Sequence, residues 1–539
     1  AEPTARLRDV LYRAGYRSVR DSDDAEGFAG SDTIVFNGKL KYANFILFYQ
    51  AEGAEIRTAE SLLNGRELNN VQKAMVAAGI VQSAYNAPAA ALILTWLLEQ
   101  KPNPTREEIK DVLTSIFIRD AGYEHYYLAV KLATELRDFG EFRPSLEVVG
   151  KPCGKIDGAA LVSGEPVFVE DKVPENAWCL HVLRSPFASA YIKSIDTSEA
   201  EKLPGVAAIL TAYNTPETHY MQAGQGNPEP SPHDRRLFNR KVRHVGDRVA
   251  GIIARTPEIA DQAAALIKVE YEPQGAVYTV EEAMAEGAPL VHNGEVIYNA
   301  GAPADLAEYN KLAGDEREGK VVYQFPLGAD IHKNIAASNK GGIGDMEKGF
   351  AEADAIVERT YQTSQIQHTP LEPHVCYAHI EGGRLVLNCA TQVPYHVRRI
   401  VSWVCGIPEN KIHVIKERVG GGYGSKQDIL VEDLTGYAAW VTGKPVYYRN
   451  TRAEEFYANS TRHPMRVKVK MGGKKDGTIT ALFMEVCANT GPFGNHCLTV
   501  PMNSCSKTLP LFAVDNMAYD LKVFYTNTPP AGAYQGYGT

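Results

Sequence analysis

The sequence predicts an α+β protein made of several domains. Its 539 residues correspond to about three or four domains at ~150 residues each. Strand-like runs dominate from residue 345 onward, and two helical patterns, at residues 394–405 and 429–442, lie between them. Hydrophobic residues make up 44% and charged residues 22% of the chain, a composition that excludes wholesale disorder, collagen and coiled coil.

The charge and hydropathy patterns exclude two classes of partner. The net charge of -9 argues against non-specific nucleic-acid binding, which needs clustered Lys and Arg. The longest apolar run, residues 89–98, is shorter than the roughly 18 residues of a membrane helix. We therefore expect no nucleic acid and no membrane as partners. The chain starts at Ala1 without the apolar core of a secretion signal, so we expect that residues upstream are missing.

The eight cysteines are scattered, and the first is Cys153. No CxxC pair occurs, so neither a zinc site nor a thioredoxin-type site is indicated. Single cysteines in a large acidic chain without a signal favour a reducing cytoplasm. We interpret most of them as small buried apolar residues.

Turn signals and changes of pattern divide the chain into five segments. Residues 1–55 form a small mixed region, in which runs at 32–36 and 44–48 around Asn37-Gly38 predict a hairpin. Residues 56–140 predict helices, one with a Thr105/Glu108 capping box. The remaining segments are a Pro- and Gly-containing linker at 141–155, a mixed region at 156–285 with a predicted strand at 166–170, and residues 286–539, strand-rich after an irregular start.

The strongest local feature is the run Val419-Gly420-Gly421-Gly422-Tyr423-Gly424-Ser425-Lys426-Gln427. It follows a predicted strand at 411–416 and precedes a predicted helix, so its backbone N–H groups could hold an anion at a helix N-terminus. It is neither a Walker A loop nor a clean dinucleotide fingerprint. From the residues alone, a plain glycine turn is as good an interpretation as a ligand loop.

Three further features are weaker. Thr391-Gln392 lies at a strand end, where an amide could donate to a ligand, although a helix-capping Thr beside an ordinary Gln is the more common case. His368, Glu372 and His374 invite a metal interpretation, but the intervening prolines break any helical spacing, and we predict no metal site. The run 533–538 is a glycine- and tyrosine-rich loop.

Taken in order, these segments resemble the molybdenum hydroxylases of the xanthine dehydrogenase family, with the closest likeness to its selenium-dependent or hypoxanthine/xanthine oxidase branch. Residues 243–250 resemble a strand of the family's hammerhead domain, and residues 344–354 resemble the entry to its molybdopterin domain. Gln392, the glycine loop and residues 534–538 match three cofactor- or substrate-facing motifs in the right order. The resemblance implies a degenerate ferredoxin-like module at 1–55, a degenerate helical iron–sulfur-type module at 56–140, an α/β hammerhead domain at 156–285, and the first part of a molybdopterin-binding domain at 286–539.

The resemblance also implies roles for individual residues. Gln392 would hydrogen-bond an oxygen ligand of molybdenum, and Gly422, Tyr423 and Gly424 would lie against the metal end of the pterin. Gln427 and Gln535 would face the substrate. Gln82 would make one pterin contact, although an exposed glutamine at a helix end is an equally good interpretation.

Two departures concern the substrate. Xanthine-oxidising members usually carry Glu at the position of Gln427 and Arg at the position of Gln535. Two amides form hydrogen bonds but supply no net charge. The resemblance therefore implies a hydroxylase without implying xanthine as its substrate.

A third departure concerns iron. The family's first two modules each hold a two-iron cluster by four Cys thiolates, and this chain has no cysteine before Cys153. Carboxylates, amides and apolar groups do not replace soft thiolates, so we predict no iron–sulfur cluster in this chain. The eight matching positions are Asp24, Ala29, Asp32 and Asn44 in the first module and Ser83, Asn86, Ile118 and Asp120 in the second.

The implied function is that of a component of a molybdenum-dependent hydroxylase that oxidises a purine or related N-heterocycle. The resemblance implies molybdopterin as cofactor and leaves its cytosine dinucleotide form and a selenium ligand open. The family's catalytic glutamate would lie on a second molybdopterin-half chain or a missing C-terminal half. Electrons would pass to a partner subunit that carries FAD, iron–sulfur clusters or both. The alternatives are a non-catalytic scaffold and an oxidoreductase of the aldehyde or carbon monoxide type.

Overall fold

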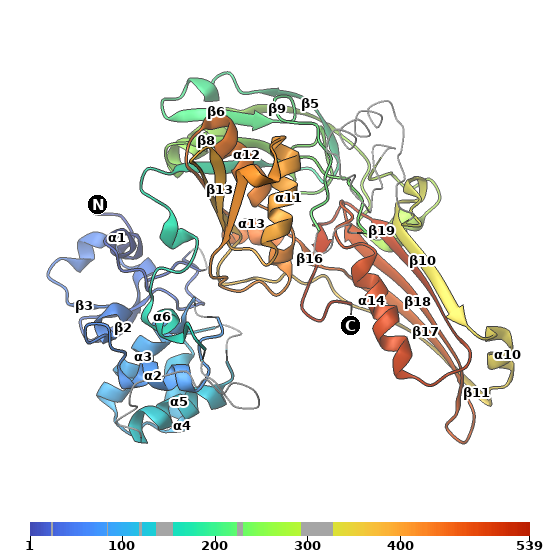
Figure 1. Cartoon of the computed structure of the whole chain (residues 1–539), viewed down its shortest axis with the longest axis horizontal. Coiled ribbons are helices and arrows are strands. Elements are labelled where there is room, and N and C mark those ends of the chain that lie inside the picture. Colours follow the sequence, from blue (N-terminus) through green and yellow to red (C-terminus); the bar gives the residue numbers. More distant parts are fainter. Residues whose placement is uncertain are drawn as a thin grey trace. The chain divides into compact units, whose positions relative to one another are not determined.

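The computed structural model describes residues 1–22, 25–83, 85–117, 121–135, 155–223, 230–292 and 327–538. The chain forms two compact units, which are described separately (Figure 1). The N-terminal unit comprises Ala1–Lys172 together with the short segments Pro370–Pro373 and Arg418–Gly421. The large unit comprises Val173–Thr369, His374–Glu417 and Gly422–Thr539.

The N-terminal unit starts with a hairpin whose turn is Asn37-Gly38, as predicted. Both turn residues have positive φ, 48° and 77°, which is the geometry of a two-residue hairpin turn. This tight turn makes the partner strand start at Lys39, so the predicted strand at 44–48 is wrong, and those residues form short helical turns instead.

Helices form the rest of this unit, and the predicted capping box is confirmed: Glu108 N donates to Thr105 Oγ1 at 3.3 Å and Thr105 N to Glu108 Oε2 at 2.7 Å. The helix 87–100 is buried in the core over residues 87–94 and at Leu97, and its last two residues are exposed. The elements are α1 (Leu7–Arg13), β1 (Thr33–Phe36), β2 (Lys39–Tyr42), β3 (Ile56–Arg57), α2 (Asn70–Ala77), α3 (Ala87–Gln100), α4 (Arg106–Leu113), α5 (Tyr123–Glu135) and α6 (Gly158–Ser163).

The strand predicted at 166–170 is wrong, because a carboxylate takes the backbone donors that a sheet would need. Asp171 Oδ2 accepts from Val167 N at 2.9 Å and from Phe168 N at 3.0 Å. The same carboxylate pairs with the buried Arg20 at 3.1 Å. The segment is therefore a turn held by a buried ion pair.

The large unit contains a seven-stranded sheet in the order β14-β13-β12-β15-β4-β8-β6 and a five-stranded sheet in the order β10-β19-β18-β17-β11. Helices α11 and α12 pack on the first sheet over a continuous apolar core, and α14 lies along the second (Figure 1). A smaller sheet has the order β7-β5-β9. The strands are β4 (Trp178–Arg184), β5 (Ala190–Asp196), β6 (Val206–Thr211), β7 (Lys241–Val242), β8 (Arg248–Ala254), β9 (Lys268–Pro273), β10 (Ile335–Ile343), β11 (Ala355–Gln362), β12 (Val375–Glu381), β13 (Arg384–Cys389), β14 (Ile412–Lys416), β15 (Val446–Arg449), β16 (Thr461–Arg462), β17 (Met465–Gly473), β18 (Ile479–Gly491), β19 (Met517–Tyr525) and β20 (Ala531–Gly532). The helices are α7 (Pro257–Leu266), α8 (Val280–Met284), α10 (Met346–Ala351), α11 (Pro394–Cys405), α12 (Glu432–Thr442), α13 (Arg452–Tyr457) and α14 (Thr499–Thr508).

The helix predicted at 394–405 is confirmed, and the one predicted at 429–442 starts later, at Glu432. The glycine loop is therefore not joined directly to the first turn of a long helix, and its anion-binding groups would be its own N–H groups. Apart from its last residue, Lys155, the predicted linker lies outside the described residues, and the predicted domain boundaries stay predictions. Among the residues that the structure describes, no helix is long and apolar enough to cross a membrane.

Candidate cofactor and substrate site

Gln392 lies in the connection between β13 and α11, where backbone contacts fix its position. Its N–H donates to Lys426 O at 2.8 Å, and the buried Thr391 hydroxyl donates to the same carbonyl at 3.3 Å. Thr391 Oγ1 also accepts from Val393 N at 3.1 Å. Val393 is the N-cap residue of α11, and no side chain caps this helix, so the alternative that Thr391 caps the helix is wrong. The Gln392 side chain is exposed, and its Oε1 accepts from Gly424 N at 3.3 Å. Within the described chain its Nε2 donates to no residue, which leaves a donor for a ligand oxygen.

The last two glycines of the loop pack tightly against this side chain and against the backbone. A Cβ on Gly422 would lie 2.5 Å from Gln392 Oε1. Gly424 has a φ of +106°, and a Cβ there would lie 2.7 Å from Ala533 O. Tyr423 between them also has a positive φ, 54°. Glycine is needed at Gly424, where the φ is positive and the clash is with backbone, whereas at Gly422 the clash is with the exposed side chain of Gln392.

The loop that follows β20 completes this wall. Gln535 N donates to Tyr423 O at 2.7 Å, and an Arg462 guanidinium nitrogen donates to Gln535 O at 2.9 Å. Two side chains pack against the Tyr534 ring. The Arg462 guanidinium lies 4.0 Å from the ring centroid, and the centroid of the His368 ring lies 4.3 Å from it. The structure therefore brings Gln392, Gly422–Gly424 and Gln535 into one continuous set of contacts.

Gln427 belongs to the same turn, because its N–H donates to Gly424 O at 3.0 Å, and its side chain is half-buried. Gln82 is different. It is an exposed residue of the N-terminal unit, past the end of α2, and its Nε2 donates to Gly79 O at 3.4 Å. The structure thus gives Gln82 the contact expected of a glutamine at a helix end, and its pterin contact stays a prediction.

His368 acts in this wall as a buried neutral imidazole. Its Nε2 lies 2.6 Å from Ala533 O and its Nδ1 lies 3.1 Å from Ser460 O. Burial lowers the pKa of His368 to about 4, so the ring is neutral at neutral pH. In the described ranges, no group of three or more His, Cys, Asp or Glu side chains could hold a metal ion.

Sequence analysis missed three polar residues behind the wall, Asp428, Arg462 and His496. Asp428 and His496 are fully buried, with His496 Nε2 3.2 Å from Asp428 Oδ1. Asp428 directly follows Gln427, and Arg462 precedes His463-Pro464, but neither neighbourhood forms a recognisable motif. His496 lies far from the loop in sequence, so only the folded chain brings it there.

The positions that match iron–sulfur ligands carry other chemistry in the N-terminal unit. Ala29 is buried and apolar. Asp32 Oδ2 accepts from Asn44 N at 2.8 Å, so this carboxylate is used in the fold. Ser83 and Asn86 are buried as well, whereas Asp24, Ile118 and Asp120 lie outside the described residues. This donor set contains no thiolate and does not fit an iron–sulfur cluster.

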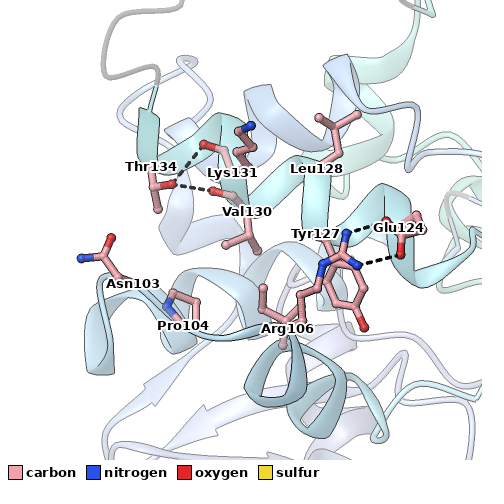
Figure 2. A pocket seen from close by; sticks show the side chains of 10 residues that line it. Asn103, Pro104, Arg106, Glu124, Tyr127, Leu128, Val130, Lys131 and Thr134 are labelled. Atoms are coloured by element: carbon pink, nitrogen blue, oxygen red, sulfur yellow. Dashed lines mark hydrogen bonds and ion pairs between the residues drawn. The ribbon is translucent and has the colours of Figure 1, made fainter.

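The N-terminal unit has a hollow of about 450 Å³ between α4 and α5. Figure 2 shows Arg106 there, with two hydrogen bonds to Glu124 at 3.2 and 2.7 Å, and the Thr134 hydroxyl turned back to its own helix. None of the predicted site residues lines this hollow.

Three family models match parts of this chain. Residues 328–539 match the molybdopterin cofactor-binding domain, residues 163–275 match the a/b hammerhead domain of aldehyde oxidase and xanthine dehydrogenase, and residues 58–131 match the [2Fe-2S] binding domain. The fold is thus that of a molybdopterin-binding oxidoreductase. The chain belongs to the xanthine dehydrogenase family of molybdenum hydroxylases.

Individual relatives show how far the likeness extends. "Probable hypoxanthine oxidase XdhD" of Escherichia coli K12 is 50% identical over 99% of this chain and 57% of its own length. "Nicotinate dehydrogenase large molybdopterin subunit" of Eubacterium barkeri is 28% identical over 73% of this chain and 82% of its own length. The solved aldehyde oxidoreductase of Desulfovibrio gigas has a TM-score of 0.85 over 100% of this chain and 57% of its own, at 23% identity, and so shows the fold alone. The chain spans little more than half the length of the hypoxanthine oxidase relative.

Proposed function

We propose that this chain forms one side of the active site of a molybdenum-dependent hydroxylase that oxidises a purine or a related N-heterocycle. The observation that carries the proposal is the glycine wall, in which Gly424 N contacts Gln392 Oε1 and Tyr423 O accepts from Gln535 N. A wall built from backbone atoms and one amide side chain suits a large polar cofactor better than a small ion.

The residues of the wall fit the metal end of a pterin cofactor. Gln392 Nε2 has no partner among the described residues and would donate to an oxygen of the metal centre. Gly422, Tyr423 and Gly424 would hold the cofactor at close range, since no Cβ can be added to either glycine without a clash. When bound, the cofactor supplies the two-electron oxidation of an electron-poor ring carbon.

The substrate is proposed to be a purine or a similar N-heterocycle such as hypoxanthine. The hypoxanthine oxidase relative, 50% identical, supports this assignment. Gln427 and Gln535, attached to the two ends of the wall by backbone hydrogen bonds, would each offer one donor and one acceptor to a ring edge. An amide pair suits a neutral ligand, because neither side chain can balance a charge.

Partners would complete the active site. The nicotinate dehydrogenase relative, of whose large molybdopterin subunit this chain covers 82%, supports a division of the cofactor domain between two chains. A further partner with FAD, iron–sulfur clusters or both would accept the electrons, because the N-terminal unit lacks thiolates at the matching positions. We place the protein in the cytoplasm; the seven described cysteines, all free, support a reducing compartment.

The test is to purify the full-length protein from its own organism with whatever co-purifies and to assay it anaerobically with a dye acceptor. We expect stoichiometric molybdenum and oxidation of hypoxanthine or another purine. Absence of molybdenum would favour a non-catalytic scaffold, and oxidation of aldehydes without purines would favour the aldehyde branch. Selenium analysis and nucleotide analysis of the released pterin test the two cofactor variants that the resemblance allows.

The matched variants are Gln392→Ala, which removes the free amide, and Gln274→Ala, which removes a half-buried glutamine whose side chain donates to Glu272. Only the first should lower kcat, by about 10- to 1000-fold if one donor to the reacting centre is lost.

A further inference from the structure

Gln535 is the second residue of a tight turn. Tyr537 N donates to Tyr534 O at 2.9 Å, which closes the turn. Gly536 has a φ of +80°, the positive value that a type II turn requires at its third residue. Glycine adopts a negative φ as readily, so the peptide between Gln535 and Gly536 could rotate into the type I form. The turn also borders a cavity of about 250 Å³, so packing alone does not fix it.

Hydrogen bonds hold Gln535 on both sides of its Cα. Its N–H donates to Tyr423 O at 2.7 Å, which joins the turn to the glycine wall. Its C=O, the carbonyl of the peptide that could rotate, accepts from an Arg462 guanidinium nitrogen at 2.9 Å. Rotation of that peptide would turn the carbonyl away from the guanidinium. The two bonds together fix the backbone on either side of the exposed Gln535 side chain, and with it the direction in which this side chain leaves the turn.

Arg462 is itself held close to the turn. It lies in β16, where it is paired in register with Gly532 of β20, the strand that leads into the turn. Its backbone N–H donates to Ile366 O at 2.9 Å, and its guanidinium carbon lies 4.0 Å from the centroid of the buried Tyr534 ring. No carboxylate of the described residues pairs with this guanidinium. Its contacts are therefore with the carbonyl and the aromatic ring of the turn.

We infer that Arg462 is a positioning residue that tunes substrate binding in the proposed active site by holding Gln535 in one orientation. The inference rests on the proposed function, in which Gln535 faces the ring edge of the substrate. Arg462 acts through the turn and not by touching the substrate. A lysine could donate one hydrogen bond to the carbonyl, but it lacks the planar guanidinium that contacts the carbonyl and the Tyr534 ring together.

The first test measures the turn without any reaction. Deuterium exchange of backbone N–H groups is followed by mass spectrometry in the full-length holoenzyme. Arg462→Gln should speed exchange in residues 533–538 by roughly tenfold, as for one lost hydrogen bond, and Arg462→Lys should give an intermediate rate. Arg466→Gln is the matched control, because this half-buried arginine of β17 pairs with Glu281 and Glu485 at 3.4 and 3.5 Å. It should leave exchange in the turn unchanged.

The second test determines whether the turn acts on the substrate through Gln535. kcat and KM for hypoxanthine are measured in the unchanged protein, in Arg462→Gln, in Gln535→Ala and in the double variant. We expect Arg462→Gln to raise KM by roughly 3- to 10-fold, with a smaller change in kcat and an unchanged molybdenum content. In the Gln535→Ala background the same substitution should change KM by less than about twofold, because the side chain that Arg462 positions is gone.

The two tests separate this inference from the function on which it rests. An unchanged exchange rate in Arg462→Gln overturns the hold of Arg462 on the turn and leaves the proposed function intact. A rise in KM that persists in the Gln535→Ala background overturns the action through Gln535. Faster exchange in Arg462→Gln, together with no oxidation of any purine or related N-heterocycle by the unchanged protein, supports the hold on the turn and overturns the proposed function.

Discussion

The two units of this molecule differ in how much of the family's cofactor sites they keep. The N-terminal unit contains the positions that match iron–sulfur ligands, and the large unit contains the proposed pterin wall. In the N-terminal unit the family's iron–sulfur sites would depend on eight side chains, and none of the eight positions that match them carries a cysteine, while the helices and the hairpin form. In the large unit the proposed pterin wall depends mainly on backbone atoms, and its glycines, its positive φ values and its contact to Gln392 are all present.

This difference follows from the chemistry of the two sites. A thiolate ligand can be exchanged for a carboxylate without moving the backbone, so a cluster site is lost by substitution while the fold persists. A wall of N–H and C=O groups is part of the fold, and its loss would require the loop itself to change conformation. Fold and binding site are therefore coupled in the large unit and uncoupled in the N-terminal unit.

The sharpest way to test the comparison is to restore the thiolates. We expect the unchanged chain to contain no stoichiometric iron or acid-labile sulfide. Cysteines at Asp24, Ala29, Asp32 and Asn44 together should bind about two iron atoms per chain after reconstitution, if the ligand chemistry alone was lost. Metal analysis and the visible absorption of a two-iron cluster give the result. A variant with only three of the four cysteines is the control, and stoichiometric iron in the unchanged chain contradicts the comparison.

The second prediction concerns the wall. Gly424→Ala places a Cβ 2.7 Å from Ala533 O at a φ of +106°, so both strain and a backbone clash oppose it. We expect a loss of about 4 kcal/mol in the free energy of unfolding and at least a tenfold loss of bound molybdenum. Gly443→Ala is the matched control: this helix-capping glycine has a φ of +63° with open space around it and should cost only about 1 kcal/mol. Equal effects of the two variants would show that the wall is an ordinary turn.

The sequence predicted the parts of the molecule that depend on local patterns. The strand that ends before Gln392, the helix at 394–405 and the Thr105 capping box follow from periodicity and spacing alone. The ordered motifs pointed to Gln392, Gly422–Gly424 and Gln535, which the structure brings into contact.

Other parts depend on contacts that no local pattern contains. The strand predicted at 166–170 fails because Asp171 takes its backbone donors. The strand predicted at 44–48 fails because a two-residue turn moves the pairing to Lys39. Asp428 and His496 meet across a sequence separation that local reasoning cannot bridge.

The third prediction tests how firmly the Tyr534 loop is held. Burial lowers the folded pKa of His368 to about 4, whereas an unfolded histidine has a pKa near 6.5. The unfolded chain therefore binds a proton first as the pH falls, and stability from this residue is lost between about pH 6.5 and 4, by about 3 kcal/mol. Urea unfolding over this range should show a flatter dependence for His368→Gln than for the unchanged protein. The same slope in both proteins would mean that His368 is not held neutral.

The smallest predicted effect concerns Asp32, a position that matches an iron–sulfur ligand of the family. Asp32 Oδ2 accepts from Asn44 N at 2.8 Å, and Asp32 O accepts from Ala43 N at 3.1 Å, so the side chain supports the connection after the hairpin. Asp32→Ala should lower the free energy of unfolding of the N-terminal unit by about 1–2 kcal/mol because a buried donor loses its partner. Asp32→Asn, which keeps an acceptor oxygen, should recover most of this loss, as measured by chemical denaturation. If Asp32→Ala leaves the free energy of unfolding unchanged, the Asp32 side chain has no structural role, and a cysteine at this position would not destabilise the unit. If it is destabilising, the N-terminal unit has adapted to the absence of its cluster, and a reconstituted cluster must first offset that loss.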